Sequence, residues 1–143
     1  MRRLNLTKAK ERSRRMIKIA YIIGPYRADS VYDIHTNIFA AETLAAYCAL
    51  AGVFPYCPHK NTAYLDGLTD DELWLEGNKE LLRRGIADIG IVSARYKESS
   101  GSLEEIKLCT ELNIPLIFEQ EYDDPKKLVI FIRRAAYADS VCN

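Results

Sequence analysis

The regular alternation of apolar runs with helical segments constrains this chain more than any other feature of its sequence. Four short apolar runs have strand character, at residues 17–23, 53–57, 86–92 and 114–118. Four segments with helical spacing or helix-start signals follow them in turn, at residues 36–50, 69–84, 102–112 and 124–136. A repeated strand–helix order predicts a parallel sheet with right-handed crossovers and helices on both faces. We therefore expect an α/β fold: a single flavodoxin/Rossmann-like three-layer domain with a parallel sheet of four to five strands.

Local signals mark the ends of several of these elements. Gly52 follows the first helical segment, where a glycine suits a C-terminal cap. Asp124 and Pro125 supply an N-cap and a first-turn proline for the last helix. Residues 58–69 contain Pro, His, Asn and Gly, and this composition predicts a polar loop.

Charge is balanced overall but unevenly distributed. The 143 residues, the length of one domain, include 20 basic and 20 acidic side chains. Residues 1–16 hold seven Lys or Arg and one Glu, a net charge of +6, so the rest of the chain carries −6. We therefore predict a basic N-terminal arm at residues 1–16 and one α/β domain at residues 17–143. Because a chain without net charge has no global field to recruit nucleic acid, we expect no nucleic-acid partner.

The cysteines and the apolar runs exclude several classes of protein. The four cysteines, at positions 48, 57, 109 and 142, include no C-x-x-C pair, so neither a disulfide scaffold nor a structural zinc site is expected. No apolar run reaches the ~18 residues of a membrane span, and the arm lacks the apolar core of a secretory signal. We expect a cytoplasmic protein that uses no metal and no organic cofactor and does not contact a membrane.

In a parallel sheet the ligand site lies beyond the carboxyl ends of the strands. This rule selects Gly24, Pro25, Tyr26 and Arg27, directly after the first strand. Glycine permits close approach of a ligand, Tyr26 can donate a hydrogen bond or stack, and Arg27 can pair with an anion. The alternative is an ordinary strand-ending turn with an exposed arginine. The segment is neither a dinucleotide-binding glycine loop nor a P-loop, because a second glycine and a lysine are missing.

The second candidate segment follows the second strand. It contains His59 and Asn61, which we expect at the mouth of the cleft. The alternative is a polar turn in which Asn61 bonds its own backbone. Cys57 and His59 are too few ligands for a zinc site, and His35 is the only other histidine.

The third candidate segment lies between the third strand and the third helix. We expect Ser100, Gly101 and Ser102 just before the helix N-terminus, where free N–H groups and the helix dipole form a cradle for an anion. Glu105 is expected in the first turn of that helix. Ser102 and Glu105 also have the spacing of a capping box, which would only satisfy backbone donors. The two interpretations are compatible, because a nucleophile needs an oriented, ionised carboxylate at the cleft.

Six short motifs that include these residues occur in order along the chain. They are Tyr21-Ile-Ile-Gly24-Pro25-Tyr26-Arg27, Asn37 followed by an alanine-rich helix, Gly52, Pro58-His59-x-Asn61-Thr62, Ala87-Asp88 and Ser100-Gly101-x-x-x-Glu105. In this order and spacing they resemble the nucleoside 2-deoxyribosyltransferase superfamily, most closely its small phage and bacterial branch, the DUF4406-type proteins. The resemblance covers about residues 17–120.

The resemblance implies roles for individual residues. It implies a glutamate nucleophile that attacks C1′ of the sugar, and Glu105 matches that position. It implies that Tyr26 lines the sugar site and that Asn37 and Asp88 belong to substrate-binding motifs. Family members usually carry an Asp that assists departure of the base, and this chain has Glu80 at the matching position. The alternative for Glu80 is a solvated charge on a helix face.

The expected function is cleavage of an N-glycosidic bond, or transfer of a (deoxy)ribosyl group, on a nucleoside or nucleoside 5′-monophosphate. The resemblance also implies a homo-oligomer, a dimer or larger, in which neighbouring subunits complete the site. One alternative is a non-catalytic nucleotide-binding or sensor domain on the same fold. Another is an interaction protein whose basic arm binds nucleic acid.

Overall fold

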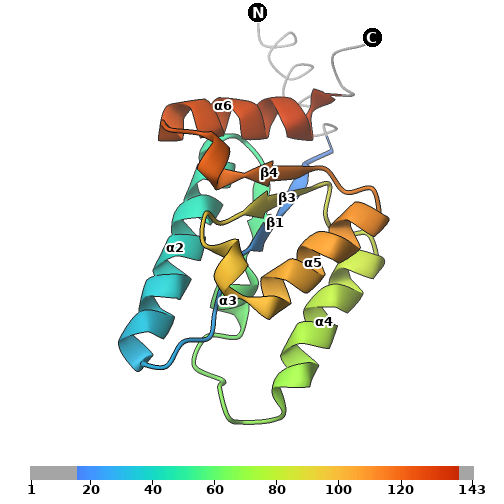
Figure 1. Ribbon diagram of the computed structural model, residues 1–143. Coiled ribbons are helices and arrows are strands. Elements are labelled where there is room, and N and C mark those ends of the chain that lie inside the picture. Colours follow the sequence, from blue (N-terminus) through green and yellow to red (C-terminus); the bar gives the residue numbers. More distant parts are fainter. Residues whose placement is uncertain (1–15, 139–143) are drawn as a thin grey trace, which may run out of the picture.

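The four strands form one parallel sheet in the order β2-β1-β3-β4 (Figure 1). The computed structural model describes residues 16–138, so all of the predicted basic arm except Met16 lies outside the described residues. The strands are β1 (Ile19–Ile23), β2 (Phe54–Tyr56), β3 (Ile89–Val92) and β4 (Leu116–Phe118). The predicted α/β fold of flavodoxin/Rossmann-like type is confirmed, with four strands among the described residues.

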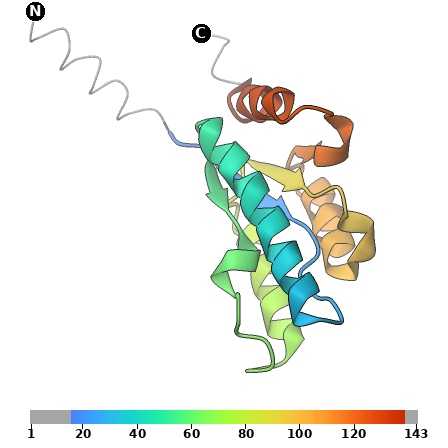
Figure 2. The same ribbon diagram turned by 90° about the vertical axis from the view of Figure 1, so that its left-hand side faces the viewer.

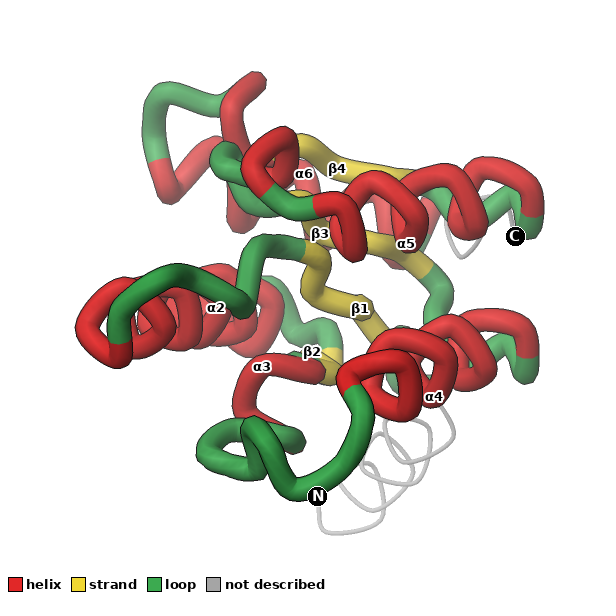
Figure 3. Tube along the Cα trace, turned by 60° about the horizontal axis from the view of Figure 1, so that its bottom comes forward, coloured by secondary structure: helices red, strands yellow, loops and turns green. Residues whose placement is uncertain are grey.

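Helices cover both faces of this sheet. The helices are α2 (Val31–Leu50), α3 (Pro58–Asn61), α4 (Asp71–Arg83), α5 (Ser100–Glu111) and α6 (Pro125–Ala136), with short 3-10 turns η1 (Tyr96–Glu98) and η2 (Glu119–Glu121). Helices α2 and α6 pack on one face, whereas α4 and α5 pack side by side on the other (Figures 2 and 3). The described helices include none that is both long and apolar enough to cross a membrane.

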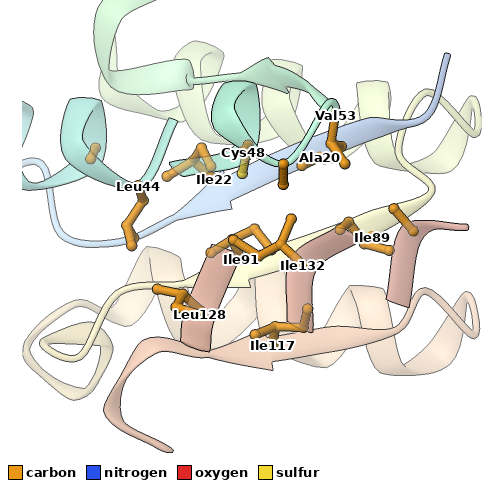
Figure 4. Packing of buried hydrophobic residues seen from close by; sticks show 13 residues of the cluster. Ala20, Ile22, Leu44, Cys48, Val53, Ile89, Ile91, Ile117, Leu128 and Ile132 are labelled. Carbon is orange, nitrogen blue, oxygen red and sulfur yellow. The ribbon is translucent and has the colours of Figure 1, made fainter. Parts of the chain in front are cut away.

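The face that carries α2 and α6 has a purely apolar core. Because side chains alternate along a strand, Ala20 and Ile22 of β1 point to this face. There they meet Leu44 from α2 and Ile132 from α6, both completely buried (Figure 4). Removing water from such side chains stabilises the fold by about 1.5–3 kcal/mol for each large residue.

The face that carries α4 and α5 has a second apolar core. Tyr21 and Ile23, the alternate residues of β1, contact Leu82 of α4 and Cys109 of α5 here. Strand β1 is thus buried on both faces, which explains why its sequence is continuously apolar rather than alternating.

Most predicted elements are present, and their ends differ where local capping was not recognised. Helix α2 begins at Val31 instead of residue 36, because the Ser30 side chain accepts a hydrogen bond from the Asp33 N–H. The predicted polar loop begins with the short helix α3, whose first residue is Pro58. The cap at Gly52, with φ of 78°, is confirmed, as is the Asp124 N-cap of α6.

Candidate active site

The carboxyl ends of the first three strands meet at one edge of the sheet. Gly24 follows β1, Pro58 lies just beyond β2, and Ser93 follows β3. A Cβ atom on Gly24 would lie 2.9 Å from Ser93 Cβ and 3.7 Å from His59 Nε2, so only glycine allows these segments to approach so closely. The prediction that the three segments share one edge is confirmed.

A cavity of about 250 Å³ opens at this edge. Five segments contribute to its wall: the turn after β1, helix α3 with the loop behind it, helix α4, turn η1, and the start of α5. The lining residues are Gly24, Tyr26, Arg27, Pro58, His59, Thr62, Asp66, Trp74, Leu75, Asn78, Glu98, Ser99, Ser100, Gly101, Ser102 and Glu105. Most of these side chains are polar or charged, and polar groups that converge in a cleft are typical of small-molecule sites.

Glu105 is the buried carboxyl group of this cavity. The residue is only 8% exposed, yet it belongs to the cavity lining. Burial raises the pKa of its carboxyl group from the ordinary 4.5 to about 7, although Tyr21 and the Lys79 ammonium group act in the opposite direction. Glu105 can therefore exchange between its neutral and ionised forms near neutral pH.

The capping box between Ser102 and Glu105, one of the two interpretations of this segment, does not form at the start of α5. The N-cap is Ser99, whose Oγ accepts a hydrogen bond from the Ser102 N–H at 3.1 Å. Ser100, Gly101 and Ser102 therefore form the first turn of α5 instead of preceding it, and Glu105 lies in the second turn. Because Ser99 already caps the helix, Glu105 has no capping role, and its position at the cavity needs another explanation.

The Tyr21 hydroxyl lies beneath Glu105, on the side of β1 that faces α5. Tyr21 Oη and Glu105 Oε2 are both buried and have no partner in good hydrogen-bond geometry among the described residues. They are nevertheless close enough to influence each other: the Tyr21 hydroxyl lowers the pKa of Glu105, while burial, followed by the Glu105 charge, raises the pKa of Tyr21. Buried polar atoms without partners are costly, which suggests that they are retained for function.

Two buried side chains hold the turn after β1. His59 Nε2 lies 2.9 Å from the carbonyl oxygen of Gly24 and 3.1 Å from that of Pro25. Since both partners are acceptors, Nε2 carries the hydrogen, and burial lowers the pKa of His59 so that the ring is neutral. Asn37 Nδ2 donates to the Tyr26 carbonyl at 3.1 Å, and Asn37 Oδ1 accepts from Arg95. Asn37 thus positions the turn from outside the cavity lining.

Two contacts join this turn to the segment between α3 and α4. Tyr26 Oη donates to Asp66 Oδ2 at 2.9 Å, and Arg27 forms an ion pair with Asp71 at the start of α4. Both charged groups of the ion pair are largely exposed. Arg27 therefore lies at the cavity rim, where an anionic ligand would compete with Asp71 for its guanidinium group.

Five residues proposed from the sequence lie outside the cavity lining. Two of them, Pro25 and Asn37, belong to the turn after β1 and to its support, and the other three are Glu80, Asn61 and Asp88. Glu80 is exposed on α4, where it pairs with Arg83 and Arg84. Asn61 is exposed at the end of α3, and the following residue lines the cavity instead. Asp88 lies at the amino end of β3, at the opposite edge of the sheet, because its Oδ2 accepts the Ile19 N–H at 2.8 Å. The placements expected for these three residues are corrected accordingly.

Several lining residues were not singled out from the sequence. Trp74 and Asn78 are four residues apart on α4, so they share the helix face that borders the cavity, and this spacing could have indicated them. Asp66 and Ser99 lie in connecting segments without periodicity, where no sequence signal pointed to them. Tyr21 does not line the cavity but acts on the Glu105 carboxyl group, and the strand alternation that separates it from Ile22 could have indicated it.

Residues 16–138 bring together no group of three or more His, Cys, Asp or Glu side chains that could hold a metal ion. Comparison of the chain with models of protein families, with curated proteins and with solved structures gives no match. The function is therefore inferred from the residues of the cavity.

Proposed function

We propose that the protein breaks the N-glycosidic bond of a nucleoside or nucleoside 5′-monophosphate, with Glu105 as the nucleophile. The observation that carries this proposal is a buried carboxyl group at a cavity of about 250 Å³ on the carboxyl edge of a parallel sheet. The sequence resemblance points to the same residue, and the loss of its capping role removes the main structural explanation for it.

In the proposed reaction, ionised Glu105 attacks C1′ of the sugar and forms a glycosyl ester. The C1′–N bond breaks, its electron pair stays on the base nitrogen, and the base leaves as this nitrogen takes up a proton from solvent. Water or a second base then attacks C1′ and gives up one proton to solvent, and the Glu105 carboxylate is released. Two displacements at the same carbon retain its configuration, as in retaining glycosidases.

Neighbouring groups support this role of Glu105. The Tyr21 hydroxyl favours the ionised form of Glu105 by lowering the carboxyl pKa. A carboxylate in such a site also stabilises the positive charge that develops on the sugar as the base departs.

A 5′-phosphate would fit the first turn of α5. The backbone N–H groups of Ser100 and Gly101 begin this helix and face the cavity edge, where the helix dipole favours an anion. Ser102 Oγ is buried without a partner among the described residues and can donate to a ligand oxygen. Arg27 at the rim supplies a further cation once it separates from Asp71.

The test combines product analysis with trapping. Incubation with a panel of nucleosides and nucleoside 5′-monophosphates, followed by chromatography, should release free base. A 2-fluoro sugar analogue slows the second displacement, so mass spectrometry should then locate a covalent adduct on Glu105. An adduct on another carboxylate would overturn the assignment of the nucleophile.

The second candidate function is a non-catalytic nucleotide-binding or sensor domain. It is favoured by the helix α4 wall, where Trp74 and the amide Asn78 border the cavity and the carboxylate of Glu80 does not. An amide hydrogen-bonds a base without giving it a proton. Tight binding of a nucleotide, measured by calorimetry, without release of base over long incubation would favour this alternative.

We also propose that the chain forms a homo-oligomer through the surface beside the cavity mouth. Tyr32 and Phe39 on α2 and Tyr64 and Leu68 in the adjoining loop are each about 70% exposed or more. Tyr64 Oη lies 3.2 Å from His35 Nδ1, which places Tyr64 beside the face of α2 that carries Tyr32 and Phe39. Sedimentation analysis should show a dimer or larger species that Leu68→Asp dissociates, whereas a monomeric wild-type chain would contradict the proposal.

A further inference from the structure

The leaving base is the part of the proposed reaction for which the described residues of the cavity provide no acid. Departure of a neutral base is assisted by general acid catalysis, in which a side chain gives its proton to the base nitrogen. Six lining residues have ionisable side chains: Tyr26, Arg27, His59, Asp66, Glu98 and Glu105. Because Glu105 is the proposed nucleophile, the acid would have to be one of the other five.

The two remaining carboxyl groups are engaged as acceptors. Asp66 Oδ2 accepts the Tyr26 hydroxyl at 2.9 Å, and Glu98 Oε2 binds the Arg95 guanidinium group at 2.8 Å. An ionised carboxylate only accepts hydrogen bonds, whereas a general acid must carry a proton. The ionised form suits both contacts, so neither group has a proton to give.

The other three ionisable side chains do not give up their protons near neutral pH. Burial lowers the pKa of His59, so its ring is neutral, and its Nε2–H is held by two backbone carbonyl groups. Burial raises the pKa of the Tyr26 hydroxyl. The hydrogen bond to Asp71 raises the pKa of Arg27, which is high for any guanidinium group.

Helix α4 contributes an indole ring and an amide to the cavity wall instead of an acid. Trp74 and Asn78 are half-buried, line the cavity and lie one helical turn apart. Glu80, on the same helix, is exposed and pairs with Arg84. An indole ring can stack on a flat heterocycle and an amide can hydrogen-bond it, but neither transfers a proton to it.

We propose, building on the glycosidic function proposed above, that the substrate is an N-glycoside whose base already carries a positive charge. The nitrogen bonded to C1′ then belongs to a cationic aromatic ring, as in a pyridinium nucleotide. When the C1′–N bond breaks, its electron pair neutralises the ring, and the base leaves without taking up a proton. Such a base needs no acid, so the groups that line the cavity are sufficient for its departure.

The proton balance distinguishes this reaction from hydrolysis of a neutral nucleoside. Ionised Glu105 forms an ester with C1′ as the neutral base departs. Water then attacks C1′ and gives up one proton to solvent, and the Glu105 carboxylate is released. One base and one proton are therefore released for each water consumed. Hydrolysis of a neutral nucleoside releases no net proton, because the base takes one up.

Both groups of the α4 wall suit a cationic ring. The face of an indole ring carries partial negative charge, so Trp74 attracts a flat cation more strongly than a neutral ring. The Asn78 side chain both donates and accepts hydrogen bonds, so it can pair with the carboxamide of a pyridinium base or with the polar edge of a purine. Trp74 therefore favours the charge of the base, and Asn78 orients its ring.

The charge of the lining also favours a cation. Three carboxyl groups and one guanidinium group line the cavity, those of Asp66, Glu98, Glu105 and Arg27, and Arg27 already pairs with Asp71. A cleft with an excess of one charge concentrates ligands of the opposite charge. A positive base also lowers the pKa of Glu105, which burial raises to about 7, and so favours the ionised nucleophile.

The first experiment compares nucleotides that differ mainly in the charge of the base. The full chain is incubated with 7-methylguanosine 5′-monophosphate or guanosine 5′-monophosphate, and with nicotinamide mononucleotide or its reduced, neutral form. Chromatography measures the free base, and each rate is divided by the uncatalysed rate, because cationic bases also leave more readily in water. We expect the cationic member of each pair to be favoured about 10²-fold or more, the contribution of a missing general acid. In weakly buffered solution, one proton should appear for each cationic base released.

The second experiment adds an acid to the α4 wall. Asn78→Asp should raise the rate of base release from guanosine 5′-monophosphate about tenfold or more below pH 6, where the new carboxyl group is partly protonated. It should change the rate for the methylated nucleotide little. Asn113→Asp is the matched control, because Asn113 is exposed beyond the far end of α5 and outside the cavity lining. The control should leave both rates unchanged.

The fluorescence of Trp74 gives a measure of base binding that is independent of catalysis. Trp74 is the single tryptophan of the chain, so quenching of its emission reports a ring stacked on it. In the Glu105→Gln variant, which keeps the ligand intact, 7-methylguanosine 5′-monophosphate should quench this emission. It should bind about tenfold more tightly than guanosine 5′-monophosphate, as a cation over an indole ring does.

Two outcomes would overturn the proposal. Equal rate enhancement for the cationic and the neutral member of each pair would show that the cavity does supply an acid, while the proposed glycosidic function would stand. Release of base from none of the four nucleotides would remove that function and this inference together. Quenching by the methylated nucleotide would then assign the cavity to binding without cleavage.

Discussion

The two faces of the sheet are built from the same strands but differ in what they bury. The face covered by α2 and α6 contains only apolar contacts, such as those of Ile22, Leu44 and Ile132. The face covered by α4 and α5 also buries the Tyr21 hydroxyl, the Ser102 hydroxyl and the Glu105 carboxyl group, each with an atom that lacks a partner among the described residues. One face is therefore held together by apolar contacts alone, whereas the other also buries polar groups beside the cavity, at a cost in stability.

The largest effect is expected from Glu105→Gln. This change keeps the size of the side chain but removes the attacking anion, so the rate of base release should fall by several orders of magnitude, roughly 10³-fold or more. The variant should remain folded and bind nucleotide. Glu104→Gln is the control, because Glu104 points outward to Lys79 and its loss should leave the rate unchanged. Full activity of Glu105→Gln would contradict the proposed mechanism.

Two substitutions, one on each face of the sheet, should change the free energy of unfolding by very different amounts. Leu44→Ala leaves a cavity in a completely buried position and should lower the free energy of unfolding by about 2–5 kcal/mol. Ser102→Ala on the opposite face removes a hydroxyl without a partner, so it should change stability by less than about 1 kcal/mol. Urea denaturation measures both values. Equal destabilisation by the two changes would remove the contrast between the faces.

The pH dependence of stability should reveal the buried carboxyl group. The pKa of Glu105 in the folded state, about 7, lies above its ordinary value of 4.5, so folding favours the protonated form. The contribution to stability is complete below pH 4.5 and is lost as pH rises to about 7, a change on the order of 3 kcal/mol. Glu105→Gln lacks this loss and should exceed wild type in stability at pH 8. Parallel stability curves for the two proteins would contradict the burial argument.

The smallest expected effect concerns phosphate at the cavity rim. Arg27→Ala should weaken binding of a nucleoside monophosphate about tenfold while sparing the nucleoside, because a charge-assisted contact contributes about 1.5–3 kcal/mol. Asp71→Asn should have the opposite sign, since it frees Arg27 from its ion pair. Calorimetric titration with both ligands measures these effects. Equal changes for nucleoside and monophosphate would show that Arg27 does not recognise the phosphate.

The sequence predicted the packed strands and helices better than the residues that line the cavity. Periodicity records which residues avoid water, so it located the four strands and most of helix α2. It does not record which face of a helix borders a cavity. Glu80 was placed at the site by the family resemblance, whereas Asn78, two residues earlier on α4, lines the cavity.

The residue at which helix α5 begins was also predicted wrongly. Ser99, Ser100 and Ser102 can each begin a helix, and only the structure shows that Ser99 does so. That shift of the helix start removes the capping-box alternative for Glu105 and leaves its place at the cavity as the remaining interpretation. Tyr21 belongs to the first motif, but no role was predicted for it, because it lies within a run of apolar residues whose pattern its aromatic ring satisfies.

The contacts of Tyr137 have a consequence for biosynthesis. Its hydroxyl accepts from the Lys18 N–H and donates to the Gly52 carbonyl at 2.7 Å, so it joins the start of β1, the turn before β2 and the end of α6. Strand β1 occupies the middle of the sheet, yet Lys18 at its start and Tyr137, which anchors it, are 119 residues apart in the sequence. The nascent chain must therefore keep its first strand soluble until α6 has emerged, which makes the interval before that point the one in which chaperones matter most.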